Sequence, residues 1–162
     1  DARVFGDARV FGDARVFGNA QVHGDAQVHG NAQVSGNARV SGDAQVSGNA
    51  QVFGNARVFG NAQVSGNAQV FGNARVFGDA WVLGNAQVCF TCSSTPIVLS
   101  GLRWTITITD ANMQIGCQGH PIAKWAKFAD RTIAAMDSYA LTFWTAHKTT
   151  IMALADTKAA QS

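Results

Sequence analysis

The sequence predicts a mainly β fold: a parallel β-helix of five three-strand coils, followed by a small α+β cap. The hexapeptide (Asp/Asn)-Ala-x-Val-x-Gly occurs fifteen times between residues 1 and 90 without an insertion or deletion. A fixed hexapeptide period is typical of a β-helix. From residue 91 the period is lost, and Trp and Met become frequent. We therefore predict a β-helix over residues 1–90, a linker over 91–96 and an α+β capping domain over 97–162.

Each hexapeptide predicts one short strand and one corner. In Ala-x-Val-x, alternation places Ala and Val on one face of the strand and the two variable residues on the other. Gly can adopt positive φ at the corner, and the Asp or Asn that follows tolerates it better than most residues. Small inward side chains require a thin interior, such as a triangular prism with three strands per coil. Each residue then lies above its counterpart 18 positions later.

This register sorts the outward residues into three ladders, one for each face of the prism. The first face carries Arg3/Phe5, Gln21/His23, Arg39/Ser41, Arg57/Phe59 and Arg75/Phe77. The second carries Arg9/Phe11, Gln27/His29, Gln45/Ser47, Gln63/Ser65 and Trp81/Leu83. The third carries Arg15/Phe17, Gln33/Ser35, Gln51/Phe53, Gln69/Phe71 and Gln87/Cys89.

Seven phenylalanines point outward in this register, and exposed aromatic clusters indicate an interface. On the first face Phe59 and Phe77 are expected to stack beside an arginine ladder, which combines apolar area with cation–π contacts. The third face, with Phe53 and Phe71, ranks second. The predicted interface residues are Phe5, Arg39, Arg57, Phe59, Arg75, Phe77, Phe53 and Phe71. The alternative is that the aromatic side chains form intramolecular ladders that stiffen the prism.

The two ends of the predicted prism differ. The first three hexapeptides, residues 1–18, are identical and carry no cap, so their strand edges are expected to pair with another molecule or to continue into further sequence. At the other end the capping domain is expected to close the last coil. We predict strands over 97–102, 103–109 and 113–117, with a turn over 110–112. Two helices follow, one from Pro121 and one from Ser138 to about Ala155.

Cys89-x-x-Cys92 and Cys117-x-x-His120 form two pairs of potential metal ligands. Their spacing fits a structural zinc site, in which thiolates and imidazole complete a tetrahedron. Such a site would join the last coil to the cap. The alternative is that Cys117 is a core residue, as free cysteines usually are, and that His120 lies at the entrance of a helix. No other cofactor is predicted.

Charge and hydropathy argue against several partners. The net charge is +2, there is no Glu, and no basic run suggests nucleic-acid binding. No apolar stretch approaches the ~18 residues of a membrane span. His23 and His29 raise the question of an enzyme, but they lie on adjacent faces of a flat ladder without a substrate pocket, so catalysis is not expected.

The chain resembles hexapeptide-repeat proteins of bacteria and phages that are labelled by similarity to polymer-forming cytoskeletal families. The resemblance rests on the Asp-Ala-Arg-Val-x-Gly repeats, on Ile115-Gly116-Cys117-x-x-His120 and on Trp125-x-x-Phe128. It implies a left-handed helix, a phage or prophage origin, side-by-side trimers as in other left-handed β-helices, and a cytoplasmic or virion-associated location. It implies no chemistry.

We therefore expect a non-enzymatic structural module that self-associates as a trimer or edge to edge, or that binds another protein. The first alternative is a phage-encoded protein that occupies a host protein. The second is an enzyme related to hexapeptide-repeat acyltransferases or γ-class carbonic anhydrases, which also use surface histidines.

Overall fold

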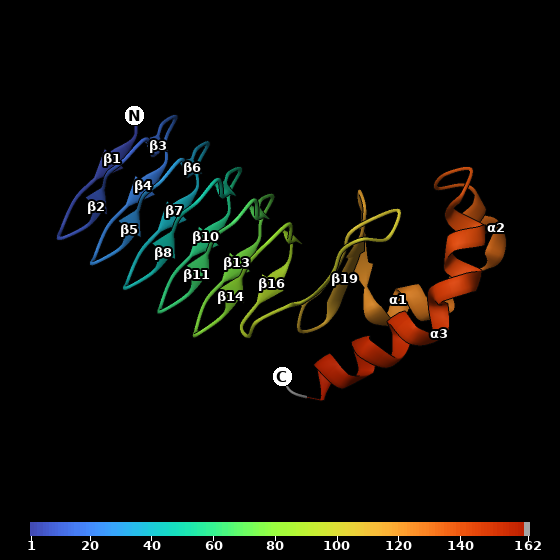
Figure 1. The fold of residues 1–162 in the computed structure, drawn as a ribbon. Helices are drawn as coiled ribbons and strands as arrows, with labels where there is room; N and C mark the ends of the chain where they lie inside the picture. Colours follow the sequence, from blue (N-terminus) through green and yellow to red (C-terminus); the bar gives the residue numbers. More distant parts are fainter. Residues whose placement is uncertain (161–162) are drawn as a thin grey trace.

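The computed structural model describes residues 1–160, and a parallel β-solenoid of about five coils fills the repeat region (Figure 1). This confirms the predicted fold class. Its strands each span two residues: β1 (Arg3–Val4), β2 (Arg9–Val10), β3 (Arg15–Val16), β4 (Gln21–Val22), β5 (Gln27–Val28), β6 (Gln33–Val34), β7 (Arg39–Val40), β8 (Gln45–Val46), β9 (Gln51–Val52), β10 (Arg57–Val58), β11 (Gln63–Val64), β12 (Gln69–Val70), β13 (Arg75–Val76), β14 (Trp81–Val82) and β15 (Gln87–Val88). The handedness of the coil stays a prediction.

Every third strand joins the same parallel sheet, so the prism has three faces. The first sheet has the order β1-β4-β7-β10-β13-β16, the second β14-β11-β8-β5-β2 and the third β15-β12-β9-β6-β3. Arg57 pairs with Arg39 on one side and with Arg75 on the other. The register of 18 residues, and with it the composition of the three ladders, is therefore as predicted.

The solenoid core consists of the inward Ala and Val of each hexapeptide. From Ala20 to Val88 all of these side chains have no solvent exposure. In the first coil they are only partly covered, and Val4 is 46% exposed, because residues 1–160 place no coil on their other side. The prediction of a thin core made of two small side chains per strand is confirmed.

At each corner, Gly provides the positive φ and the Asp or Asn that follows it provides a polar side chain. The repeat glycines from Gly6 to Gly84 all have φ between +64° and +73°, whereas no other residue type among the described residues has a positive φ. The tolerance of Asn and Asp for positive φ is thus not what selects them here. Instead, their side chains form hydrogen-bonded ladders: Asn37 Nδ2 donates to Asn55 Oδ1 at 3.1 Å, and Asn55 Nδ2 to Asn73 Oδ1 at 3.2 Å.

The solenoid continues one strand beyond the repeats. β16 (Thr91–Cys92) pairs in parallel with β13, and Cys92 is fully buried beside Val76. Residues 91 and 92 were predicted as linker, so the linker prediction is wrong at these two positions. These residues form a strand because Cys92 is small and apolar enough to take the place of a repeat Val. The pairing of Arg75 with Thr91 spans 16 residues instead of 18.

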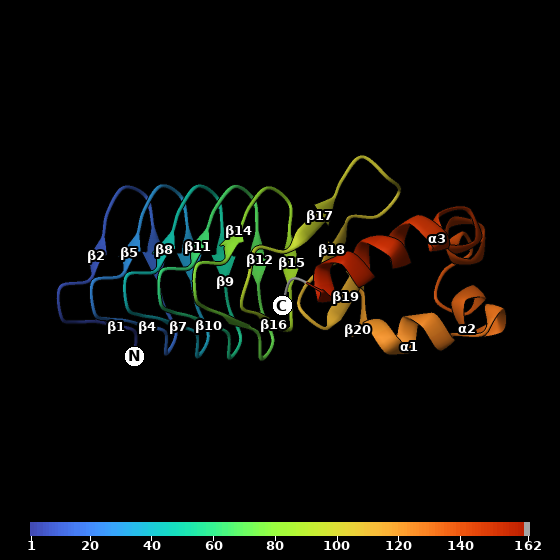
Figure 2. The same ribbon diagram turned by 90° about the horizontal axis from the view of Figure 1, so that it is seen from below.

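The cap combines an antiparallel sheet and three helices beyond the last coil (Figure 2). Its elements are β17 (Ile97–Leu99), β18 (Ile106–Ile108), β19 (Asn112–Ile115), β20 (Gln118–Pro121), α1 (Ile122–Lys127), α2 (Asp130–Ala134) and α3 (Ala140–Ala159). The meander and two of the helices were predicted. β20 and α2 were not, and His120 lies in β20 directly before Pro121, the N-cap residue of α1. Residues 161 and 162 of the predicted capping domain lie outside the described residues.

The cap has a hydrophobic core of its own, separate from that of the solenoid. Ile106, Ile108 and Met113 of the sheet pack with Trp125 of α1 and Trp144 of α3, and all five are nearly or fully buried. The Trp125 indole N–H donates to the Met113 carbonyl at 2.8 Å, which fixes α1 against β19. The sheet and the helices of the cap therefore share one core.

Two threonine hydroxyls of the C-terminal segment close the last coil. In the preceding coils the N–H of the first strand residue donates to an Ala carbonyl of the next coil, as Gln69 does to Ala86 at 2.8 Å. In the last coil Trp81 N–H donates to Thr95 Oγ1 at 3.2 Å, and Gln87 N–H donates to Thr107 Oγ1 at 3.1 Å. The linker and the cap thus each supply one of the acceptors that a sixth full coil would provide, in agreement with the expectation that the C-terminal segment closes the last coil.

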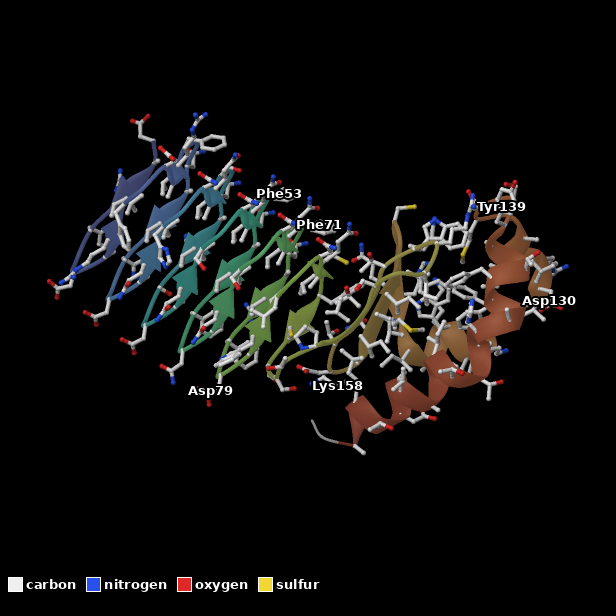
Figure 3. The ribbon with its side chains drawn as sticks, in the orientation of Figure 1. Phe53, Phe71, Asp79, Asp130, Tyr139 and Lys158 are labelled. Atoms are coloured by element: carbon white, nitrogen blue, oxygen red, sulfur yellow. The ribbon has the colours of Figure 1, made fainter. Side chains whose placement is uncertain are left out.

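A buried ion pair reinforces this junction. Lys158, near the end of α3, is 2% exposed; its ammonium donates to Ser94 Oγ and lies 4.0 Å from the carboxylate of Asp110. Asp110 Oδ2 also accepts hydrogen bonds from the backbone N–H and the hydroxyl of Ser93, at 2.7 and 2.8 Å. Figure 3 shows Lys158 on the side of α3 that faces the last coil.

Candidate interaction surface

The first sheet displays three arginines in register. Arg39, Arg57 and Arg75 begin β7, β10 and β13, and all three side chains are exposed. Because parallel strands lie ~4.8 Å apart, their backbones repeat at that distance, and the three like charges form a column. Within residues 1–160, the ion pair formed is that of Lys158 with Asp110, so no carboxylate of the described chain pairs with these guanidinium groups.

The arginine column borders a groove of about 300 Å³ along one corner of the prism. We call it the arginine groove; it is lined by Asn37, Arg39, Asn55, Arg57, Asn73 and Arg75. Its three asparagines form a ladder in which each side-chain amide donates to the next along the corner. The groove therefore offers three cations and a row of amide groups at one common spacing.

Aromatic side chains stack on the same sheet, next to the arginines. The Phe59 and Phe77 rings lie 5.1 Å apart with an angle of 9° between their planes, as predicted. Phe5 stacks on His23 at 4.9 Å in the first two coils. Phe59 and Phe77 are half-buried because each ring covers the other, while Phe5 is 51% exposed. We call Arg39, Arg57, Arg75, Phe59 and Phe77 the arginine face.

The other faces carry weaker versions of this arrangement. On the third sheet Phe53 and Phe71 stack at 5.4 Å, but their neighbours at the arginine position are Gln51 and Gln69. On the second, Phe11 stacks on His29 at 4.9 Å. Figure 3 shows Phe53 and Phe71 along one edge of the solenoid and Asp79 along the opposite edge. The predicted interface residues are thus divided between two faces, and intramolecular aromatic ladders are present on both.

The two candidate histidines are part of these ladders. His23 and His29 lie on different sheets, each against the ring of a phenylalanine from the preceding coil. They do not converge within the chain, in agreement with the sequence prediction that they diverge.

The four predicted zinc ligands are not brought together. Within residues 1–160, no group of three or more His, Cys, Asp or Glu side chains could hold a metal ion. The Cys89 thiol donates to Gln114 Oε1 at 3.0 Å, and the Cys92 thiol donates to the Ser94 carbonyl at 3.0 Å. Cys117 is exposed, and His120 packs edge-on against Trp125 and Phe128. The geometry does not support the zinc prediction, because ligand spacing in sequence did not account for the burial of Cys92.

Burial also makes the junction cysteines poor thiolates. It raises the pKa of Cys92 to about 12, and the nearby Asp110 carboxylate acts in the same direction. Burial raises the pKa of Cys89 as well. The pKa of His120 is lowered by burial and by the charge of Lys124. These residues therefore serve as packing and hydrogen-bonding groups.

A second hollow lies in the cap. A cavity of about 90 Å³ is lined mainly by apolar side chains, including Trp104, Trp125, Phe143 and Trp144. The Trp144 indole N–H is buried without a hydrogen-bond partner. It is not accessible to water, so it supplies no binding group to this cavity.

No helix within the described residues is long and apolar enough to cross a membrane.

One known family model matches parts of the repeat region. The family model described as YdcK Beta solenoid repeat matches residues 8–24, 32–48, 50–66 and 68–89. These residues are similar to YdcK beta-solenoid repeats, and together they make up less than half of the chain. No curated protein and no solved structure gives a significant match to the chain. The matched ranges include all six residues that line the arginine groove, and the description specifies a fold and no activity.

Proposed function

We propose that this chain is a non-enzymatic interaction scaffold that self-associates through its arginine face. The observation that carries the proposal is the column of three exposed guanidinium groups, which pair with no carboxylate of residues 1–160 and lie directly beside the stacked Phe59 and Phe77 rings. Arg and aromatic residues are enriched in protein interfaces, while a plain solvated surface favours Lys and Glu. The chain contains no Glu at all.

The rigidity of the face supports this role. Each strand is hydrogen-bonded to the strands of the coils above and below, and each Phe is held by its neighbour in the ladder. A preorganised face loses little conformational entropy on binding, so more of its contact energy remains as affinity. The ladder design that stiffens the prism thus also prepares the surface for a partner.

Catalysis finds less support on the solenoid. The arginine groove contains only Arg and Asn side chains, which supply neither a nucleophile nor a general base near neutral pH. His23 and His29 are stacked on phenylalanine rings outside this groove. A partner of another sequence could use the same face, and the experiment below distinguishes it from a second copy.

The test compares two matched pairs of substitutions by light scattering after size-exclusion chromatography. Phe59→Ser with Phe77→Ser removes the aromatic stack of the arginine face, and Phe53→Ser with Phe71→Ser removes the equivalent stack of the third sheet. Serine occupies the same repeat position at Ser35, Ser41, Ser47 and Ser65, so both variants are expected to fold. We expect the first pair to lower the apparent mass and the second to leave it unchanged. A wild-type chain that is monomeric at all concentrations would contradict self-association and favour a partner of another sequence.

A further inference from the structure

The corner on the far side of the first sheet is acidic. We call it the acidic corner; its residues, one per coil, are Asp7, Asp25, Asp43, Asn61 and Asp79. All five are exposed. The other two corners carry Asn in four of their five coils and form amide ladders, such as Asn31 to Asn49 at 3.1 Å. Figure 3 shows Asp79 at the end of this edge.

A run of aspartates at one corner has a cost. Asp7, Asp25 and Asp43 place like charges in consecutive coils, where they repel one another. They also give up the Asn-to-Asn hydrogen bonds that stabilise the other corners. Arg39, Arg57 and Arg75 also place like charges in consecutive coils, although the chain uses uncharged Gln at most equivalent positions. Both columns are understandable if each is neutralised from outside the chain.

We propose that the acidic corner of a second copy of this chain docks into the arginine groove. The two surfaces carry opposite charge, and one is a convex edge while the other is a groove. They also share one repeat, because both are built from the same coils, so every guanidinium can meet a carboxylate without either backbone adjusting. A flexible polyanion would have to match that ~4.8 Å repeat by bending. This inference rests on the proposed self-association and names its second surface.

The charge pattern also selects the relative direction of the two copies. From the first coil to the fifth, the arginine column reads Arg3, Gln21, Arg39, Arg57, Arg75, and the acidic corner reads Asp7, Asp25, Asp43, Asn61, Asp79. With the copies antiparallel, first coil against fifth, the neutral Gln21 meets the neutral Asn61, and the other four rows pair Arg with Asp. With the copies parallel and level, Gln21 faces Asp25 and Arg57 faces Asn61.

The antiparallel contact has a consequence for assembly. The groove and the corner are different surfaces, so a copy that uses its groove still has a free corner. Contacts between unlike surfaces do not close at two copies and instead extend the assembly. We therefore assign an open-ended association of antiparallel solenoids, held by Arg–Asp pairs of the kind that form bidentate hydrogen bonds.

The test neutralises one surface at a time with residues that the repeats already use. A groove variant carries Arg39→Gln, Arg57→Gln and Arg75→Gln, and a corner variant carries Asp7→Asn, Asp25→Asn and Asp43→Asn. Analytical ultracentrifugation at low salt should show self-association weakened by roughly tenfold or more in each. Mixed in equal amounts, the two variants should form one-to-one complexes, since each retains one surface. The control variant Arg9→Gln, Arg15→Gln and Asp13→Asn removes similar charges elsewhere and should associate like the wild type.

The outcomes separate this inference from the proposed function. If the Phe59 and Phe77 substitutions disrupt association while neither charge variant does, the arginine face is an interface but the acidic corner is not its partner. If only the groove variant is weakened, another surface of the second copy fills the groove, and the inference is again overturned. If the wild type does not associate, both proposals fail.

The direction is tested by cross-linking in a Cys117→Ser background, which removes the exposed native thiol. A mixture of Arg75→Cys and Asp7→Cys chains should be joined by a short thiol cross-linker if the copies are antiparallel. A mixture of Arg75→Cys and Asp79→Cys should be joined instead if they are parallel and level, which would overturn the assigned direction.

Discussion

Thr107 Oγ1 accepts a hydrogen bond from the Gln87 N–H at 3.1 Å, and it does so in the place where every earlier coil offers an alanine carbonyl. A side chain of the cap thereby imitates the backbone of a missing coil. Thr107 is 1% exposed, so water does not serve the same N–H. The cap therefore both covers the edge of the third sheet and satisfies its Gln87 N–H with a hydrogen bond.

Substitution of Thr107 by valine should therefore destabilise the junction. Valine has nearly the same shape but no acceptor, which leaves the part-buried Gln87 N–H unsatisfied, at a cost of about 1–3 kcal/mol. Urea denaturation followed by tryptophan fluorescence measures the change, because all four Trp residues lie in the last coil or the cap. The matched control is Thr95→Val, since Thr95 is exposed and water can replace its hydroxyl beside Trp81. Equal losses in the two variants would contradict the assigned role of Thr107.

Removal of Asp110 should have a larger effect. Alanine at this position removes the carboxylate that lies 4.0 Å from the buried ammonium of Lys158, and it removes the acceptor of both Ser93 hydrogen bonds. Loss of one member of a buried ion pair costs about 3–5 kcal/mol. Thermal unfolding should show a clear decrease in the midpoint for Asp110→Ala. A control at exposed Asp156 of α3, also changed to alanine, should shift the midpoint little.

The three cysteines should react in order of exposure. Cys117 is exposed, Cys89 is half-buried with a raised pKa, and Cys92 is buried with a pKa of about 12. At pH 8, alkylation followed by mass spectrometry should modify Cys117 first and Cys92 last, because the thiolate is the reactive form. In denaturant all three should react at similar rates. Rapid labelling of Cys92 in the folded protein would contradict its place in the solenoid core.

The raised pKa of Cys92 makes the stability of the fold depend on pH. The folded state disfavours the thiolate, whereas an unfolded cysteine ionises near pH 8.5. Stability from this group is therefore complete below about pH 8.5 and is lost as the pH rises from there toward 12. Denaturation midpoints measured across this range should fall more steeply for the wild type than for a Cys92→Val variant. Parallel curves for the two proteins would contradict the assignment.

Two corner glycines with similar backbone angles should differ in their tolerance of alanine. A Cβ at Gly66 would lie 2.9 Å from the backbone nitrogen of Gly84, while a Cβ at Gly84 would meet nothing within 4 Å. Both have positive φ, +72° and +64°, so both substitutions carry a strain of roughly 1–2 kcal/mol. Gly66→Ala should lose additional stability because stacked backbones must separate. Circular dichroism during chemical denaturation measures the difference, and equal losses would show that strain alone decides.

Much of the solenoid could be predicted from the sequence because its rule is local and is repeated. Alternation determines which residues face inward, and the 18-residue register follows from three strands per coil. The cap could be predicted only in outline, since β20 contains Gly119 and Pro121 and has little strand character of its own. It forms because β19 pairs with it. The five-residue helix α2 is likewise too short for a clear periodic pattern.

The candidate surface could likewise be predicted where it follows the repeat, whereas the contacts at the junction could not. The arginine and phenylalanine ladders follow directly from the register. The zinc prediction used spacing alone and could not anticipate that Cys92 would replace a valine in the core. The contacts of Ser94, Asp110 and Lys158 join residues up to 64 positions apart and have no local sequence signal.

β16 pairs with β13, so the chain leaves the solenoid from the first sheet, with Thr91 beside Arg75. The number of hexapeptides before β16 therefore determines the direction in which the cap points. The cap is anchored to one particular sheet end, and each hexapeptide turns the chain by one face of the prism. Insertion or loss of a single hexapeptide would therefore rotate the cap by a third of a turn relative to the arginine face. Changes of 18 residues would only move it along the axis. Repeat arrays of this kind can thus vary in whole coils while preserving which side of the rod the cap projects from.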